Sequence, residues 1–254
     1  MPRHFTYWAK GAVPLDFTKS FLFDGVNESF TGNTALETHF STLMSGTTEF
    51  TVITKLKKTD AVNAFSFVAG NTTTPSNSIA KRVRSSNKYR VQIADSPVTN
   101  FVVQETSSTF TGAVFRHWGN IFDSANRFND QFIDATDVGN SNVADVGAGA
   151  ITVPTIDAVY IGQDMSGGNF FDGNIHWMAF FDKKLIASEF TELYNSGTDF
   201  DFRTSSVSGN LASYFVANNE TSWDGANWTW KDLIDTSREF VSSNMEEADL
   251  EADV

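Results

Sequence analysis

The chain has 254 residues, 41% of them hydrophobic, and 31 acidic against 18 basic residues give a formal net charge of −13. This length suits one large all-β domain, and the charge would repel a phosphate backbone or an anionic membrane, so we expect neither nucleic acid nor membrane as a partner. The absence of cysteine excludes a disulfide framework and a thiolate zinc site. Because the N-terminus has no signal-like apolar run, we expect synthesis in a cytoplasm without secretion.

Short apolar or alternating segments, separated by turns rich in Gly, Asn and Ser, predict many strands. In chain order they are residues 21–23, 50–57, 64–68, 89–94, 100–105, 113–122, 130–134, 158–161, 175–181 and 211–216. So many short strands are typical of a sandwich or jelly roll. Residues 1–18 carry aromatics without a clear period, and either an arm on a partner or a strand on the same domain would explain them.

Two short helices interrupt this pattern. Thr34 and Glu37 have capping-box spacing, and Leu36, Phe40 and Leu43 share a helical face. After the strand at 175–181, Phe190, Leu193 and Tyr194 form one face of a second helix, and Gly197 is expected as its left-handed C-terminal cap. Residues 137–155 lack periodicity and predict a long surface loop.

The order of several sequence blocks resembles laminin G-like (concanavalin A-like lectin/glucanase) domains. The matching blocks are Leu22–Gly25, Phe50–Val52, His117–Asp134, Ile161–Gln163, Phe171–Ile175 and Glu189–Gly197. The resemblance implies an all-β fold, a concanavalin A-like jelly-roll sandwich of two antiparallel sheets with one or two short helices, over residues 19–254. It also implies that the second helix packs against the sandwich as a structural element.

The family's opening block is missing before Phe21, and similar residues stand at the other end of the chain, at Leu211–Phe215, Trp228–Leu233 and Ser243–Met245. This suggests that residues 205–254 are the family's N-terminal block, circularly permuted, an order that resembles laminin G-like proteins of marine tailed phages. The resemblance implies a virion structural protein, a head or tail decoration or fibre component, with other virion proteins as partners. A homo-oligomer and weak adhesion to a host surface glycan remain open, and the alternatives are a stand-alone carbohydrate-binding lectin domain and a polysaccharide hydrolase.

Three tryptophans near the C-terminus, Trp223, Trp228 and Trp230, have two interpretations. On an extended strand Trp228 and Trp230 would project from one face, as an aromatic platform for a sugar requires. Core packing explains the same residues equally simply.

A basic run stands out in this acidic chain: Lys81, Arg82, Arg84, Lys88 and Arg90. It suits contact with an acidic neighbouring subunit or with a sulfated or uronic glycan. A solvated hairpin is the other interpretation.

Calcium is the one cofactor that the sequence leaves open. Asp130, Asp134 and Asp137, together with Asp24, Asp164 and Asp172 in turns, can offer oxygen ligands, as some members of the resembled family do at a loop edge. Asp is also common in turns for conformational reasons, so no cofactor is the simpler expectation.

We expect no enzymatic activity. Glu247, Asp249 and Glu251 have the E-x-D-x-E spacing that resembles laminarinase-type hydrolases. An acidic chain end cannot readily raise one carboxyl pKa by burial, as a general acid requires. The four histidines are scattered, and His117 and His176 are expected to be ordinary sheet residues.

Overall fold

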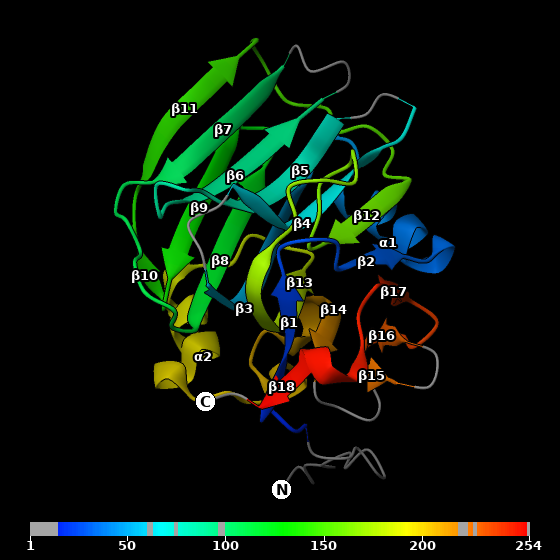
Figure 1. Cartoon of the computed structure of the whole chain (residues 1–254). Helices are drawn as coiled ribbons and strands as arrows, with labels where there is room; N and C mark the ends of the chain where they lie inside the picture. The colour runs from blue at the N-terminus through cyan, green and yellow to red at the C-terminus, as the bar shows by residue number, and fades with distance from the viewer. Residues whose placement is uncertain are drawn as a thin grey trace, which may run out of the picture.

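Two antiparallel sheets pack face to face in the computed structural model, which describes residues 15–59, 63–73, 76–95, 100–217, 223–225 and 228–252 (Figure 1). Sheet A has the order β10 (Thr136–Asp137), β9 (Phe128–Ile133), β8 (Arg116–Asp123), β3 (Glu49–Lys58), β13 (Asp172–Phe181), β1 (Lys19–Asp24) and β18 (Leu250–Ala252), and β14 (Leu211–Val216) also pairs with β13. The predicted concanavalin A-like jelly-roll sandwich is therefore confirmed.

Sheet B is the larger sheet. Its order is β11 (Asn140–Val146), β7 (Phe101–Thr106), β6 (Tyr89–Ala94), β5 (Ser76–Val83), β4 (Ala64–Asn71), β12 (Ala158–Ile161), β2 (Ser29–Gly32), β17 (Glu239–Ser243), β16 (Thr229–Lys231) and β15 (Trp223–Asp224). Figure 1 shows β7, β6 and β5 in front of β8 and β9 of sheet A.

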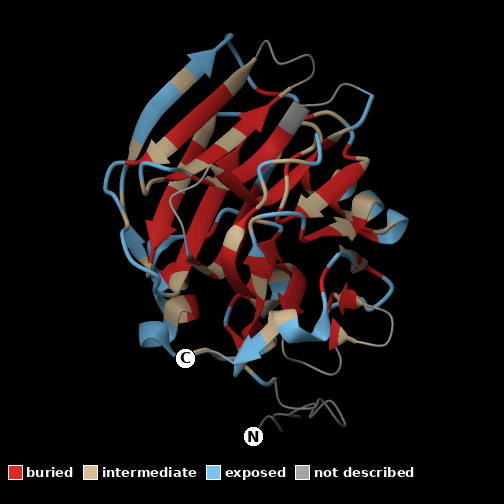
Figure 2. Ribbon diagram, viewed as in Figure 1, coloured by how far each residue is buried: buried red, intermediate tan, exposed pale blue. Residues whose placement is uncertain are grey.

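The main core fills the space between the sheets, and the alternation of strands such as β6 puts their apolar residues on that side. In β6, Tyr89, Val91 and Ile93 belong to this core, whereas Arg90 and Gln92 lie on the opposite face. Burying one such large apolar side chain contributes roughly 1.5–3 kcal/mol, so the sandwich depends on many of them together. Figure 2 shows the resulting distribution, with buried residues throughout both sheets.

Two α-helices belong to the described chain, α1 (Thr34–Met44) and α2 (Ala187–Tyr194). Helix α1 buries Leu36, Phe40 and Met44, and its N-cap is Asn33, whose Oδ1 accepts a hydrogen bond from the Leu36 N–H at 2.9 Å. The prediction of a capping box that begins at Thr34 was therefore wrong by one residue. Both Asn and Thr suit an N-cap, and the position is decided by which residue precedes the first helical turn.

Helix α2 begins after Ile186, whose N–H donates to the Glu189 carboxylate at 2.9 Å. Its C-cap is Asn195, with φ of 46°, and not Gly197 as predicted. Asn tolerates the left-handed region better than most residues, so the helix ends two residues early.

The C-terminal strands complete both sheets. β14 occupies the predicted residues and pairs with β13, β17 pairs with β2, and β18 pairs with β1. The C-terminal block thus lies beside the first strands of the chain, while the circular permutation itself stays a prediction.

Residues 137–155 are not one long loop. β10 and β11 lie in this range, and β11 pairs with β7 at the edge of sheet B. Nearly all of its residues are exposed or half-buried, which Figure 2 shows along this strand. An edge strand without an apolar face has no sequence period to reveal it.

The predicted N-terminal arm lies mostly outside the described residues. At its described end, Leu15 and Phe17 pack against apolar residues on the outer face of sheet A. This part of the arm therefore rests on its own domain. In the described part of the chain, no helix combines the length and apolar character needed to cross a membrane.

Candidate functional site

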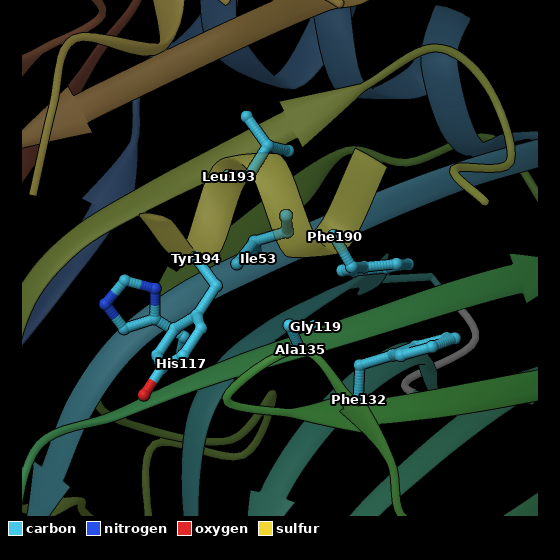
Figure 3. Close-up of a pocket in the computed structure, with 8 residues that line it drawn as sticks. All are labelled: Ile53, His117, Gly119, Phe132, Ala135, Phe190, Leu193 and Tyr194. Carbon is cyan, nitrogen blue, oxygen red and sulfur yellow. The ribbon is translucent and has the colours of Figure 1, made fainter. Parts of the chain in front are cut away.

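The outer face of sheet A is covered by α2 and by the residues that follow it. Phe190 of α2 stacks on Phe132 with ring centres 4.1 Å apart, and it lies over Gly119, where a Cβ would come within 2.3 Å of the ring. The cavity left under the helix measures about 10 Å³ and holds no more than a water molecule (Figure 3). This cavity has no room for a ligand.

The charged groups on that covered face gather around Asp199, although both nitrogens of the buried His117 have no hydrogen-bond partner in the described chain. Asp199 accepts a hydrogen bond from Trp177 Nε1 at 2.8 Å and forms an ion pair with Lys55. His117 Nε2 and His176 Nδ1 lie 3.9 and 3.8 Å from its carboxylate. Burial lowers the pKa of His117 to about 4, so this imidazole is neutral at pH 7. Both histidines are buried sheet residues, as expected.

The outer face of sheet B differs, because the buried residues of α1 belong to the main core and those of α2 to sheet A. Neither helix therefore covers it. Phe65, Val68 and Ala80 form a small apolar cluster there, with Tyr160 and Met165 packed beside it. These residues alternate with the core-facing residues of the same strands, so they are on the side away from sheet A.

Three arginines gather on this face beside the apolar cluster. Arg82 of β5 is directly opposite Arg90 of β6, and Arg84 follows β5. Like charges directly opposite each other destabilise an antiparallel pair. Glu105 of β7 is the carboxylate that balances them: Arg90 Nε donates to it at 2.8 Å, and Arg84 Nε lies 3.4 Å away. Three guanidinium groups thus share one paired carboxylate.

Arg82 has the least satisfied guanidinium of the three. Its Cζ lies 4.8 Å from the centre of the Phe65 ring, a cation–π arrangement. Its Nε is buried and has no hydrogen-bond acceptor within the described chain. Burial lowers the pKa of Arg82, and the neighbouring Arg84 and Arg90 lower it further. A cavity of about 50 Å³ adjoins it, between Phe65, Ala80, Arg82, Arg90 and Gln92.

A second acid near Arg82 is already engaged. The Asp164 carboxylate accepts hydrogen bonds from Ser166, Gly168 and Asn169 of its own loop, at 2.6 to 2.9 Å. Burial raises the pKa of Asp164, but these hydrogen bonds outweigh burial and hold it below its usual value. Asp164 therefore attracts Arg82 only at a distance.

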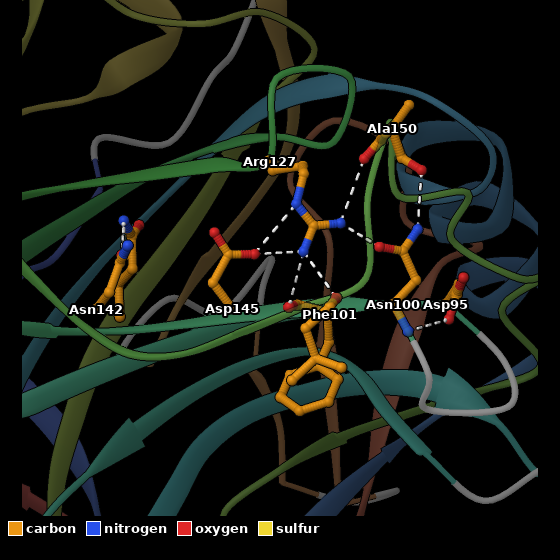
Figure 4. Close-up of polar contacts among 10 residues, drawn as sticks. Asp95, Asn100, Phe101, Arg127, Asn142, Asp145 and Ala150 are labelled. Carbon is orange, nitrogen blue, oxygen red and sulfur yellow. Dashed lines mark hydrogen bonds and ion pairs between the residues drawn. The ribbon is translucent and has the colours of Figure 1, made fainter.

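Arg127 shows what a satisfied arginine looks like in the same protein (Figure 4). Its Nε donates to Asp145 at 3.1 Å, and its Nη2 donates to the carbonyl oxygens of Val146 at 2.8 Å and Phe101 at 3.2 Å. Its Nη1 donates to the Gly149 carbonyl oxygen at 3.2 Å. Arg127 fastens the edge strand β11 to β7 and has a structural role.

Lys81 does not belong to the basic surface, contrary to the sequence prediction. It is fully buried between the sheets, where its Nζ donates to the Trp118 carbonyl oxygen at 2.9 Å and to Thr54 Oγ1 at 3.0 Å. Burial lowers the pKa of this ammonium. Strand alternation puts Lys81 with Ile79 and Val83 on the core side, so it cannot contact a partner. Lys88 lies in the hairpin turn, half-buried.

The tryptophan platform is not formed as predicted. Trp230 is fully buried among Phe21, Phe30 and other core rings, and Trp223 is also buried. Trp228 is half-buried and has a φ of 54°, so it sits in a turn before β16 and not beside Trp230 on an extended strand. The core interpretation holds for Trp223 and Trp230 because β15 and β16 pack against the main core.

The three aspartates proposed for calcium have separate partners. Asp134 pairs with Arg116 at 2.7 Å, and Asp137 accepts the Gly139 N–H at 2.8 Å. Asp130 accepts from Asn140 at 3.2 Å; burial raises its pKa, and the nearby Asp137 raises it further. Within the ranges that the structure describes, no group of three or more His, Asp or Glu residues is placed to hold a metal ion.

The E-x-D-x-E carboxylates do not share one strand face. Glu247 and Asp249 lie in the 3₁₀ turn η4 (Glu247–Asp249), and only Glu251 lies in β18. Glu247 and Glu251 are exposed. A carboxyl at such a position stays well solvated, which does not suit a general acid.

A larger cleft of about 520 Å³ lies between α1 and the 232–238 turn. Arg238 pairs with Asp232 at 3.0 Å, although its Nε, like that of Arg82, is buried without a hydrogen-bond acceptor in the described chain, and Asp182 accepts from Asn210 at 3.0 Å. Burial lowers the pKa of His39, which lines this cleft, to about 4. With one arginine and the acids Glu49 and Asp182 on its lining, the cleft has no excess of positive charge, unlike the arginine face.

The sequence pointed to Arg82, Arg84 and Arg90 but missed Phe65 and Gln92. Alternation in Tyr89–Ala94 was a usable signal, because it places Arg90 and Gln92 on the polar side of one strand. No local signal places Phe65 beside Arg82, since that contact depends on the register of β4 against β5.

Comparison with solved structures supports the fold class and little beyond it. A presumed carbohydrate-binding protein of Bacteroides ovatus superimposes with a TM-score of 0.62 at 12% identity, over 93% of this chain and 62% of that one. This chain therefore spans less than two thirds of that protein's length. The CBM40 of the Ruminococcus gnavus IT-sialidase gives a TM-score of 0.52 at 13% identity, over 69% of this chain and 97% of that one.

The NanB sialidase of Streptococcus pneumoniae gives a TM-score of 0.51 at 16% identity, over 71% of this chain and 28% of that one. No protein-family model and no curated protein sequence matches the chain. At identities this low, the superpositions establish a shared concanavalin A-like jelly-roll fold and no closer relationship. The narrower laminin G-like resemblance stays a prediction.

Proposed function

We propose that this protein is a carbohydrate-binding domain that holds its ligand on the outer face of sheet B. The observation that carries the proposal is the cavity bordered by Phe65, Arg82, Arg90 and Gln92 on the face that the helices leave uncovered. An aromatic ring with guanidinium and amide groups around it suits a sugar, which has apolar C–H faces and many hydroxyls.

The structural likenesses support the same class of function. The Bacteroides ovatus protein is described as carbohydrate binding, and the Ruminococcus gnavus CBM40 has been solved bound to α2,3-sialyllactose. A fold does not define a function, so these likenesses raise the expectation while the chain's own residues carry the argument. We propose binding without catalysis and with weak affinity at each site, raised when many copies are displayed.

The test is a glycan panel probed with the protein displayed in many copies. Gln92→Trp would fill the cavity with a ring, and Ser141→Trp would add the same ring on the exposed edge strand β11 as a control. We expect wild type and Ser141→Trp to bind a subset of the glycans and Gln92→Trp to lose that binding. Flat binding of wild type across the panel would overturn the proposal.

The virion role inferred from the order of sequence blocks remains a prediction. It is compatible with glycan binding, because an adhesion domain on a particle gains affinity from many copies. Mass spectrometry of purified virions tests it directly, and detection among capsid, tail or fibre proteins is the expected result. Contact with other virion proteins and the formation of a homo-oligomer also remain predictions.

A further inference from the structure

We propose, on the basis of the carbohydrate-binding function above, that the ligand is an acidic glycan whose carboxylate or sulfate group binds at Arg82. The charge arrangement on sheet B points to this class. Arg82, Arg84 and Arg90 bring three positive charges to one place, and Glu105 forms ion pairs with Arg90 and Arg84 only. Against Glu105 alone, two positive charges remain in excess, three less one, and the ionised Asp164 offsets part of this excess from a longer distance, on a face with no covering helix.

The orientation of the Arg82 guanidinium group, as well as its charge, favours an oxyanion as the ligand. Its buried Nε has no acceptor in the described chain, and a guanidinium cannot lose its proton to escape that cost. The Phe65 ring on one side fixes the plane of the group. Planar guanidinium groups bind planar carboxylates, or sulfate, through two parallel hydrogen bonds. Because the Nε is buried, the donors for such a ligand are the two terminal nitrogens of Arg82, which donate to no acceptor within the described chain.

The size of the cavity distinguishes an acidic substituent from a whole sugar. Its volume of about 50 Å³ is several times the roughly 10–15 Å³ that one water needs in the same measure, so it has room for a small polar group but not for a sugar ring. A sugar ring is larger and would remain outside, over the apolar cluster beside Tyr160. The acidic group would therefore anchor the ligand, and the ring would make the aromatic contact.

The net charge of −13 does not prevent this binding. Charges separated by more than about 8 Å are largely screened at physiological ionic strength, so the local arginines dominate at contact distance. Overall repulsion acts at longer range and lowers the rate of association. Binding should consequently weaken as salt rises, because the contact between arginine and oxyanion is itself screened at the surface.

The experiment compares matched glycans that differ by one acidic group, such as sialyllactose with lactose, and a sulfated with an unsulfated galactan oligosaccharide. We expect wild type to bind the acidic member at least about 10-fold tighter, the range for a charge-assisted hydrogen bond. Arg82→Gln should remove most of that preference, and Arg84→Gln should reduce it. Arg116→Gln, which makes the same change at an arginine outside this face, should preserve it.

The outcomes separate the two proposals. Equal binding of acidic and neutral partners, or an unchanged preference in Arg82→Gln, overturns the acidic-glycan inference and leaves carbohydrate binding intact. Binding to no glycan overturns both, and binding to an acidic peptide in place of a glycan would assign the arginines to a protein partner. Thermal unfolding of each variant confirms that lost binding does not reflect lost folding. Comparing the sulfate and carboxylate pairs identifies which oxyanion the cavity takes.

Discussion

The outer face of sheet A and the outer face of sheet B differ in what happens to their charged groups. On sheet A, Asp199 has Trp177 and Lys55 as partners, and Phe190 of α2 closes the surface above Gly119. On sheet B, Arg82 keeps a buried Nε without an acceptor. Both faces keep buried nitrogens without a partner, those of His117 on sheet A included, so the difference lies in charge: His117 is neutral at pH 7, whereas Arg82 is a cation beside two further arginines.

Arg127 and Arg82 show the same difference at the level of single residues, in how many hydrogen bonds each guanidinium group makes. Each is partly buried, but the Arg127 guanidinium donates to carbonyl and side-chain oxygens from three parts of the chain, and Arg82 contacts one aromatic ring. Counting satisfied donors thus distinguishes a structural arginine from the one that we propose for binding, where residue type and exposure do not.

Deletion of residues 205–254 should disrupt both sheets, and this is the largest effect that we expect. The deletion takes β14 and β18 from sheet A and β15–β17 from sheet B, and it uncovers core residues such as Phe21 and Phe30. Newly exposed apolar surface and unpaired strand edges favour aggregation. Size-exclusion chromatography and a thermal melt measure this; a monomer with an unchanged melting temperature would contradict it.

Phe190→Ala should disrupt the packing of α2 on the outer face of sheet A and leave sheet B unchanged. Losing the ring that stacks on Phe132 and lies over Gly119 should lower the free energy of unfolding by about 3–5 kcal/mol, the usual cost of such a core truncation. Urea denaturation measures the change. Glycan binding on sheet B should persist in the folded fraction, and Phe190→Leu is the milder control.

Arg127→Ala and Arg82→Ala sharpen the comparison of the two arginines. Loss of the Arg127 hydrogen bonds should lower the free energy of unfolding by about 2 kcal/mol, since several acceptors lose a charged donor. Arg82→Ala should cost less than about 1 kcal/mol, because it also relieves repulsion from Arg90. Equal losses in chemical denaturation would remove the distinction between the two sites.

The pH dependence of stability should report the covered face. The pKa of His117 is about 6.5 in the unfolded chain and about 4 when folded, because burial outweighs the attraction of Asp199 and Asp134, and Lys55 and His176 oppose protonation. Between these values the unfolded chain binds more protons, so stability is lost as pH falls from about 6.5 toward 4. The loss should be roughly 1 kcal/mol at pH 5.5.

The control for this titration is His117→Gln, which removes the titrating group. Its stability relative to wild type should improve as pH falls through that range. Parallel pH profiles for the two proteins would show that His117 does not carry the effect.

The sequence by itself determined the fold class and most of the strands. Tyr89–Ala94 was readable because it alternates, with one apolar face toward the core, whereas Ala158–Ile161 and Leu211–Val216 were readable as short apolar runs between turns. The helical period of Phe190 and Leu193 likewise identified α2, since burial of one face is a local pattern. The same reasoning selected Arg82, Arg84 and Arg90 from their unusual density of charge.

Only the tertiary structure decided which of these residues can meet a ligand. The side chain of Lys81 points into the core, and that of Arg82, one residue later, points outward. The two residues differ because they lie on opposite faces of β5. Trp230 is buried because β16 pairs with β17 over the main core. Phe65 meets Arg82 through the register of β4 against β5, a contact between chain segments that no local pattern encodes.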